Sequence, residues 1–216
     1  MASNWRRYGP PIRTDKKCPV CQVSHRRVGP LCSKHESQMR RNGGIGAPLK
    51  GIDLDIYRPL VQTMLNRYAD DDSNSGRAIS GGLALMDDIL KNYGKNCDHA
   101  TVGRKCRPYV DKLVQLGATA RSSFIECAAV YFLWEITGAQ PSASEMDMQV
   151  ATRLLLHKRT RHDCMKRSNW SRSVIGGLGY RIRCDLGTLF LQMARVCVKQ
   201  DMARREAIRA ASSFKG

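Results

Sequence analysis

Four side chains near the start of the chain constrain its fold more than any other feature of the sequence. Cys18 and Cys21 have two residues between them, ten residues follow, and Cys32 and His35 again have two between them. A tetrahedral Zn²⁺ takes four sulfur or nitrogen ligands, and a tight turn brings both members of such a pair to one point. The spacing predicts one structural zinc ion bound by Cys18, Cys21, Cys32 and His35.

The segment that carries these ligands has little else to hold it together. The apolar core of this segment is too small to stabilise a fold on its own. Because zinc binding contributes about 10–16 kcal/mol in finger peptides, we expect the metal to supply that stability. His25 is an alternative ligand, although its place in the spacer suits a loop tip better. A chance grouping of buried cysteines is the competing interpretation. The apolar residues between positions 16 and 42 are mainly Val20, Val23, Val28, Leu31 and Met39.

The second ligand pair is expected at the start of a helix. With 3.6 residues per turn, Cys32, His35 and Met39 share one face, and Lys34, Gln38 and Arg41 share another. One side of this helix would hold the metal and the other would be free for phosphates, as in a treble clef, where a knuckle and a helix supply two ligands each. The basic residues of this segment, which would offset the thiolates or contact phosphates, are Lys16, Lys17, Arg26, Arg27, Lys34, Arg40 and Arg41.

The stretch "CPVC...VGPLCSKHESQMRRNGGIGAPL" resembles a short Cys-rich element near the N-termini of many phage-encoded proteins, HNH-type homing endonucleases among them. In that element a cysteine is followed by Gly-Leu-Cys-x2-His, an Arg-rich stretch and a glycine. The resemblance is confined to residues 18–49 and implies a zinc-bound, DNA-associated element of phage or mobile-element type. The matching residues are Gly29, Leu31, Cys32, His35, Arg40, Arg41 and Gly43, with Pro30 inserted after Gly29.

The endonuclease chemistry is not expected to accompany this element. An HNH site needs a histidine base beside a second metal-binding His or Asp, with an Asn and a His further along a ββα element. Here no two histidines are adjacent, and Asn169 follows the last one too closely. No catalytic residue is assigned, and a degenerate or divergent nuclease is kept only as an alternative. The histidines are His25, His35, His99, His157 and His162.

A glycine-rich stretch, "NGGIGAPLKG", separates the metal-binding segment from the rest of the chain. It is not a phosphate-binding loop, because no Gly-Lys-Ser/Thr closes it and no apolar strand precedes it. The expected organisation is a basic mobile arm at residues 1–15, a zinc module at 16–43, a linker at 44–51 and an all-α domain at 52–216.

Helical periodicity continues through the second part, where apolar residues recur every three or four positions without sustained two-residue alternation. The segment "FIECAAVYFLWEI" is apolar nearly all round and should be the buried axis, with Thr119 as its cap and Gly138 as its end. Ser142 with Glu145 forms a capping-box signature. We therefore expect a mainly α fold, a bundle whose helices cover about residues 57–68, 77–93, 107–116, 119–138, 142–158 and 180–210, with a break around "NWSRS" and "GGLG".

The chain is strongly basic, with 36 Lys and Arg against 19 Asp and Glu and a net charge of +17. The excess lies at the two ends: residues 1–50 carry 11 basic and 2 acidic side chains, and residues 151–216 carry 15 and 4. This distribution favours a packed scaffold with two surfaces for an anion such as nucleic acid. We expect an intracellular, cytoplasmic or nucleoid-associated protein with no membrane partner, because no apolar stretch approaches the length of a membrane span.

A second anion-binding surface is predicted in "HKRTRHDCMKRSNWSR", residues 157–172. Its cations could contact phosphates, and its indole could stack on a base or enter a groove. A solvated helix end, with the tryptophan packed back on the domain, is the competing interpretation. The candidate residues are Lys158, Arg159, Arg161, Lys166, Arg167, Trp170 and Arg172, extended along the last helix by Arg195, Lys199, Arg204, Arg205 and Arg209.

Three further groups of residues could bind a metal or act in catalysis, but each has a simpler explanation. Cys97, His99 and Cys106 could hold a second zinc with a distant cysteine such as Cys164, but a loop with a partly buried thiol explains them more simply. The run "DDD" at residues 70–72 could attract Mg²⁺ but suits a solvated turn. His162, Asp163 and Cys164 are too close in sequence to face one another on a helix as base and nucleophile.

The sequence therefore predicts a zinc-containing basic protein that binds nucleic acid, in particular double-stranded DNA, and regulates transcription or replication for a phage or mobile element. One alternative is a protein-interaction module that docks on a host complex such as RNA polymerase or an effector complex. The sequence does not distinguish DNA from RNA and does not give the oligomeric state.

Overall fold

The structure is a computed structural model that describes residues 16–25, 31–42, 52–68, 71–93, 100–158 and 172–213. The expected arm at residues 1–15 and linker at 44–51 lie outside these ranges. The described chain is mainly α, as predicted, with one short antiparallel hairpin. Its elements are β1 Lys16–Lys17, β2 Ser24–His25, α1 Ser33–Asn42, the 3₁₀ helix η1 Ile52–Leu54, α2 Arg58–Arg67, α3 Asn74–Asn92, α4 Ala100–Gln115, α5 Ala120–Thr137, α6 Ala143–Leu156 and α7 Arg172–Ser213.

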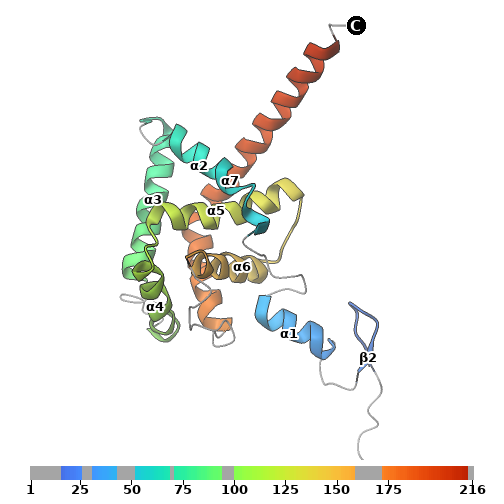
Figure 1. Ribbon diagram of the computed structural model, residues 1–216. Helices are drawn as coiled ribbons and strands as arrows, with labels where there is room; N and C mark the ends of the chain where they lie inside the picture. Colours follow the sequence, from blue (N-terminus) through green and yellow to red (C-terminus); the bar gives the residue numbers. More distant parts are fainter. Residues whose placement is uncertain are drawn as a thin grey trace, which may run out of the picture.

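Helix α5 is the buried axis of the helical domain. Figure 1 shows it crossing the middle of the domain, and it packs against α2, α3, α6 and α7. Thr119 caps its start as predicted, because its hydroxyl oxygen accepts a hydrogen bond from the Ser122 N–H. Gly138 ends it with a left-handed φ of 68°, a conformation that favours glycine. In the core, the Phe124 ring meets Phe190 of α7 edge to face, with centroids 4.8 Å apart.

Helix α7 begins at Arg172, so the expected break before Tyr180 is wrong, and the "GGLG" stretch lies inside the helix. The reason is close packing between α6 and α7. A Cβ atom on Gly179 would lie 1.9 Å from the backbone oxygen of Asp147, so only glycine allows this approach. The Asp147 carboxylate also accepts hydrogen bonds of 2.6 and 3.3 Å from Arg183. Tertiary packing therefore outweighs the poor helix propensity of glycine here.

Helix α4 also starts earlier than predicted, at Ala100, and it contains Pro108. The side chains of Cys106, Val110 and Leu113 are buried. Burial of this continuous apolar face stabilises the helix despite Pro108, although helices usually accept proline only in their first turn. Other boundaries agree more closely: Pro59 lies in the first turn of α2, and Ser142 caps α6 by accepting from the Glu145 N–H.

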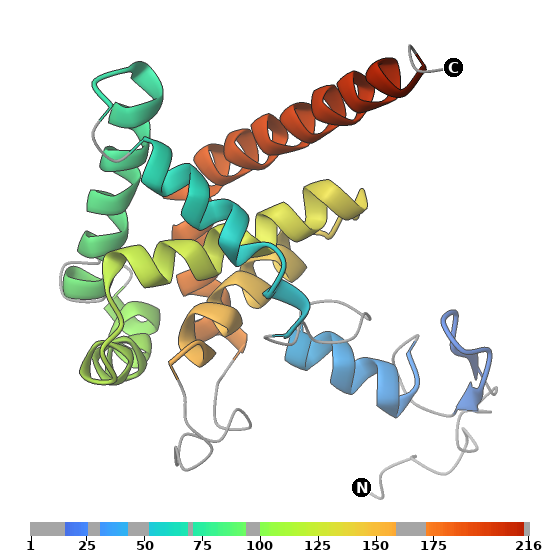
Figure 2. The same ribbon diagram turned by 45° about the horizontal axis from the view of Figure 1, so that its top comes forward.

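The two ends of the described chain lie on the outside of the helical domain. Figures 1 and 2 show the last part of α7 projecting away from the other helices. Helix α1 touches the domain through α6, and the β1–β2 hairpin lies beyond α1 (Figure 1). None of the described helices has both the length and the apolar character that a membrane crossing requires.

Candidate metal centre

The first ligand pair lies in the turn of the β1–β2 hairpin. The strands pair antiparallel, the Cys18 N–H donates to the Val23 carbonyl at 3.0 Å, and the Gln22 N–H donates to the Cys18 carbonyl at 2.8 Å. Gln22 has a φ of 59°, and among described non-glycine residues it alone has a positive φ. This left-handed residue tightens the turn and brings Cys18 and Cys21 to one side of it.

The second pair lies at the start of α1. Cys32 directly precedes the helix, and its carbonyl accepts the Glu36 N–H at 2.9 Å. The side chains of Cys32 and His35 are 9% and 7% exposed, whereas Lys34 between them is exposed. Cys32 and His35 are therefore buried on one side of the helix start, and Lys34 lies on the exposed side. The side chains of Gln38, Met39, Arg40 and Arg41 lie outside the description.

The four predicted ligands come together. Their ligating atoms all lie within 4.8 Å of one another. His35 Nδ1 is 3.3 Å from Cys18 Sγ and 3.3 Å from Cys32 Sγ, and Cys21 Sγ is 3.8 Å from Cys32 Sγ. A tetrahedral zinc with bonds of about 2.3 Å to sulfur and about 2.0–2.1 Å to nitrogen has edges of about 3.8 Å (S···S) and about 3.6 Å (S···N). The cluster therefore fits one zinc ion.

The environment of Cys18 favours its thiolate form, which is the form that binds metal. Burial alone would raise the pKa of the Cys18 thiol, but hydrogen bonds from the backbone of Cys32, Cys21 and Val20 and from His35 together lower the pKa to about 5. The pKa of Cys21 is raised: the Val23 backbone lowers it, but burial and the neighbouring Cys32 and Cys18 thiols outweigh that effect. A bound divalent cation would stabilise both thiolates together.

The ligand set also indicates the role of the ion. Three thiolates and one imidazole fill a tetrahedron and leave no open position for water or substrate, which is typical of structural and not catalytic zinc. His25, the alternative ligand, lies in β2 opposite Lys16, and its side chain lies outside the description. The chemistry that zinc would supply here is cross-linking: Cys18 and Cys21 of the hairpin and Cys32 and His35 at the start of α1 would be held in one fixed arrangement.

The predicted nucleic-acid contacts are only partly visible. Lys34 is exposed and Lys158, just after α6, is half-buried. On α7, Arg195 pairs with Glu135 at 3.1 Å and Lys199 is exposed. Arg172, Arg204, Arg205 and Arg209 lie in α7, but their side chains are not described. Outside the described ranges lie Arg26, Arg27, Arg159, Arg161, Lys166, Arg167 and Trp170.

The weaker candidate groups gain no support. Cys106 is buried in the core, and burial raises its pKa to about 12, which disfavours the thiolate that a metal would need. Asp71 accepts hydrogen bonds from the backbone N–H and hydroxyl of Ser73, the N-cap of α3, so it acts in a turn. The remaining candidates lie outside the described ranges: Asp70, Cys97, His99, His162, Asp163 and Cys164.

A buried charge cluster in the helical domain was not predicted. Glu126 of α5, 3% exposed, accepts hydrogen bonds from Arg58 at 2.7 and 3.0 Å and from Arg153 at 2.6 and 3.0 Å. Burial raises the pKa of the Glu126 carboxyl, but the two guanidinium groups outweigh it and the pKa is lowered. The cluster links α2, α5 and α6. Its signal in the sequence is a carboxylate in the first half of the nearly all-apolar segment "FIECAAVYFLWEI", whose other carboxylate, Glu135, lies near the end of the helix.

Next to this cluster, His157 closes the end of α6. Its Nδ1 lies 2.7 Å from the Leu154 carbonyl oxygen and its Nε2 lies 3.4 Å from the Ser122 hydroxyl. Burial lowers the pKa of the ring, so the neutral form is favoured. His157 is therefore part of the packing of α5 on α6, while the basic segment that it precedes begins at Lys158.

Comparisons of the chain with protein-family models, with curated proteins and with solved structures find no match. The residues themselves therefore carry the functional argument.

Proposed function

We propose that the protein is a zinc-stabilised nucleic-acid-binding protein, in which the metal fixes α1 so that its basic face meets phosphates. The observation that carries the proposal is the Cys18, Cys21, Cys32 and His35 cluster, with exposed Lys34 in the same turn as two of the ligands. A structural ion that holds a short basic helix in a fixed pose also lowers the ordering cost of binding a partner through that helix. The net charge of +17 makes a polyanion the natural partner.

The contact between α1 and α6 places the metal-binding module beside the helix that precedes the second basic segment. Helix α6 leads directly into the basic segment at residues 157–172. A helix of 14 residues is about 21 Å long, which is less than the roughly 34 Å of one turn of B-DNA, so contacts made through α1 and just after α6 could fall within one turn of a duplex. On this basis we propose double-stranded DNA as the ligand and regulation of transcription or replication, in a phage or mobile element, as the role.

Salt dependence tests the proposal. Binding of a fluorescent duplex to the zinc-loaded protein should weaken steeply with salt, with a log-log slope of about −0.9 for each phosphate contact. Lys34→Gln should reduce the magnitude of that slope by about one contact. Lys91→Gln is the matched control, because Lys91 is an exposed lysine on α3 that pairs with Asp87. Equal effects of the two substitutions would contradict a role for the α1 face.

Other outcomes separate the alternatives. Binding to single-stranded RNA in preference to duplex DNA would replace the DNA assignment. Zinc-dependent capture of a host polymerase that is insensitive to Lys34→Gln would favour a protein-docking role. Nicking of a plasmid with added Mg²⁺ or Mn²⁺ would show a nuclease.

A further inference from the structure

The four predicted zinc ligands differ in how accessible they are from solution. Cys18, Cys32 and His35 are buried, and Cys21 is the least buried of the four. Cys21 belongs to the β1–β2 hairpin, which lies beyond α1 and away from the helical domain (Figure 1). A small molecule in solution therefore meets the Cys21 sulfur before it meets the other two sulfurs.

A second sulfur lies close to Cys21. Its Sγ is 3.8 Å from the Sγ of Cys32, so an approach of about 1.8 Å would bring the two sulfurs to the bond length of a disulfide. Cys21 comes from the hairpin and Cys32 directly precedes α1. A bond between them would join the same two parts of the module that a zinc ion would join.

These observations match what selective oxidation of a cysteine requires. Hydroperoxides react with thiolates, and a cysteine that is oxidised selectively is a thiolate, is accessible, and lies beside a second cysteine. Metal coordination holds a cysteine in its thiolate form. Among the three cysteines of the cluster, Cys21 is the one that combines accessibility with a neighbouring sulfur at contact distance.

We propose that Cys21 is an oxidative modification site, at which hydrogen peroxide converts the zinc centre into a Cys21–Cys32 disulfide and releases the ion. The proposal rests on the metal centre of the proposed function and does not depend on nucleic-acid binding. Once both sulfurs are bonded to each other, Cys18 and His35 alone remain as ligands. Two ligands are too few to complete the tetrahedron of a structural zinc site.

The chemistry takes two steps. The Cys21 thiolate attacks one oxygen of hydrogen peroxide, the O–O bond breaks, and hydroxide leaves, which gives a sulfenic acid on Cys21. The Cys32 thiolate then attacks the Cys21 sulfur, the S–O bond breaks, the S–S bond forms, and a second hydroxide leaves. The two thiolates lose two electrons and the peroxide gains them; two protons from solvent convert both hydroxides into water.

The other described cysteines do not combine these properties. Cys106 and Cys127 are buried in the helical core, and burial raises the pKa of both thiols, to about 12 for Cys106. Cys184 and Cys197 are more accessible. They are thirteen positions apart on α7, or about 20 Å along the helix, so neither can form a disulfide with the other in the folded chain.

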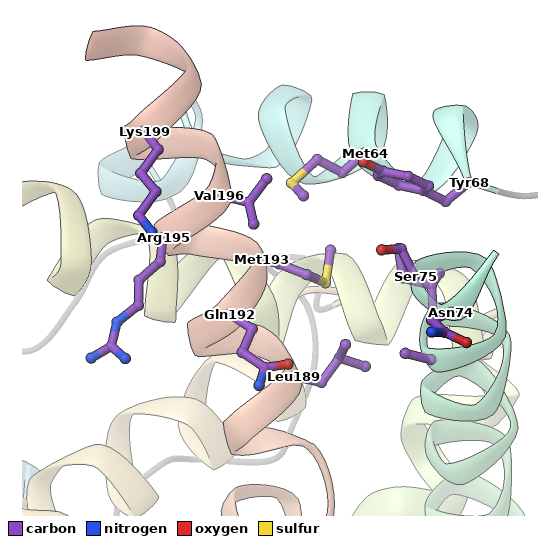
Figure 3. Close-up of a pocket in the computed structure, with 12 residues that line it drawn as sticks. Met64, Tyr68, Asn74, Ser75, Leu189, Gln192, Met193, Arg195, Val196 and Lys199 are labelled. Atoms are coloured by element: carbon purple, nitrogen blue, oxygen red, sulfur yellow. The ribbon is translucent and has the colours of Figure 1, made fainter. Parts of the chain in front are cut away.

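Methionine sulfurs are a second target of peroxide, because a thioether is oxidised to a sulfoxide. Figure 3 shows Met64 and Met193 in a pocket of about 470 Å³ between α2, α3 and α7. Met193 is buried and Met64 is half-buried. A sulfoxide there adds an oxygen atom to the helical domain and leaves the zinc ligands unchanged. Zinc release with the loss of two hydrogens therefore reports on the module, and a gain of oxygen reports on this pocket.

The test is treatment of the full-length, zinc-loaded protein with hydrogen peroxide. A chromogenic chelator follows released zinc, and mass spectrometry of tryptic peptides locates the cross-link. Cys18 and Cys21 lie on one tryptic peptide and Cys32 lies on another, so a Cys21–Cys32 disulfide joins two peptides, whereas a Cys18–Cys21 disulfide closes one peptide on itself. Fragmentation between Cys18 and Cys21 then assigns the bonded cysteine. The tryptic sites that separate these peptides follow Lys17, Arg26, Arg27 and Lys34.

Peroxide should release the zinc and produce the Cys21–Cys32 cross-link, and a thiol reductant with added zinc should reverse both changes. Zinc content is measured before the treatment. A protein without zinc would overturn the metal centre and this proposal together. A loaded protein that keeps its zinc in peroxide, or a cross-link that omits Cys21 or Cys32, would overturn this proposal alone.

A matched pair of variants tests the role of Cys21 in the rate. Cys21→His keeps four ligands in a Cys2His2 set and removes the accessible thiolate, so it should release zinc at least about tenfold more slowly than the wild type. Cys184→Ser removes an exposed cysteine outside the cluster and should release zinc at the wild-type rate. Equal release rates for Cys21→His and the wild type would contradict the proposal. The cross-link in the wild-type chain decides the outcome if Cys21→His binds zinc poorly.

Discussion

The zinc module and the helical domain are stabilised in different ways. In the module, the described side chains that are buried are Cys18, Cys32 and His35, all of them predicted metal ligands. In the helical domain, aromatic and aliphatic side chains from all six longer helices are buried in one cluster around α5. We therefore expect the module to depend on one ion, whereas the domain depends on many separate contacts.

The two regions also differ in how they respond to the loss of one side chain. Loss of one ligand removes the whole support of the module, so its fold depends on metal and on the protonation of its thiols. Loss of one core side chain only weakens the domain. The part that we propose to contact nucleic acid is thus conditional on zinc, and the fold of the helical domain is not.

Metal removal should give the largest effect and separate the two regions most clearly. With zinc contributing about 10–16 kcal/mol in comparable peptides, a strong chelator should unfold the hairpin and α1 and leave the helical domain folded. Amide NMR spectra should show loss of dispersion only for the module, while the thermal midpoint of the helical signal moves little. Cooperative loss of both regions on chelation would contradict the comparison.

Glu126→Gln should give the next largest effect, and in the helical domain alone. It leaves two guanidinium groups, Arg58 and Arg153, without their buried carboxylate, and breaking a buried pair typically costs about 3–5 kcal/mol. Urea unfolding at pH 7 measures the loss in the free energy of unfolding. Zinc content should stay unchanged.

Glu135→Gln is the control, because its pair with Arg195 is more exposed and such pairs contribute about 0–1 kcal/mol. The lowered pKa of Glu126 also gives a pH dependence. Its stabilising effect is present above the pKa of a free glutamate and is lost as pH falls through the lower pKa of the folded state. The free energy of unfolding of Glu126→Gln should therefore fall less on acidification than that of the wild type. Equal losses in the free energy of unfolding for Glu126→Gln and Glu135→Gln at pH 7 would refute the stabilising role of the Glu126 cluster.

Gly179→Ala should destabilise the packing of α6 on α7 by about 1–3 kcal/mol, the usual cost of overpacking. The added methyl group would overlap the Asp147 backbone. Gly176→Ala in the same helix should be neutral or stabilise by up to about 1 kcal/mol, since its methyl group would meet only Met148 Sδ at 3.8 Å. Thermal unfolding compares the two, and an unchanged midpoint for Gly179→Ala would exclude the close approach.

Gln22→Gly should give the smallest effect and act on the module alone. A left-handed residue with a side chain costs about 1–2 kcal/mol, a cost that glycine avoids. The variant should therefore bind zinc several-fold more tightly in a competition assay, with the unfolding of the helical domain unchanged. Weaker zinc binding would show that the φ of 59° is not the strained element of the turn.

The features that could be predicted from the sequence are those formed by residues close together in the chain. The metal ligands and the caps at Thr119, Gly138 and Ser142 are local patterns, because every interacting residue lies within a short stretch. The Glu126 cluster was not predictable in this way, because Arg58 lies 68 residues away from it. The predicted start of α7 was wrong for the same reason. Glycines usually indicate a helix break, and only the close approach of Asp147 from α6 accounts for Gly179 inside the helix.

The most direct test is the zinc content of the purified full-length protein, measured by inductively coupled plasma mass spectrometry. The proposed metal centre predicts one zinc per chain, lost in Cys32→Ser and retained in Cys184→Ser, which changes an exposed cysteine outside the cluster. A metal-free wild-type protein, or full zinc content in Cys32→Ser, would contradict it.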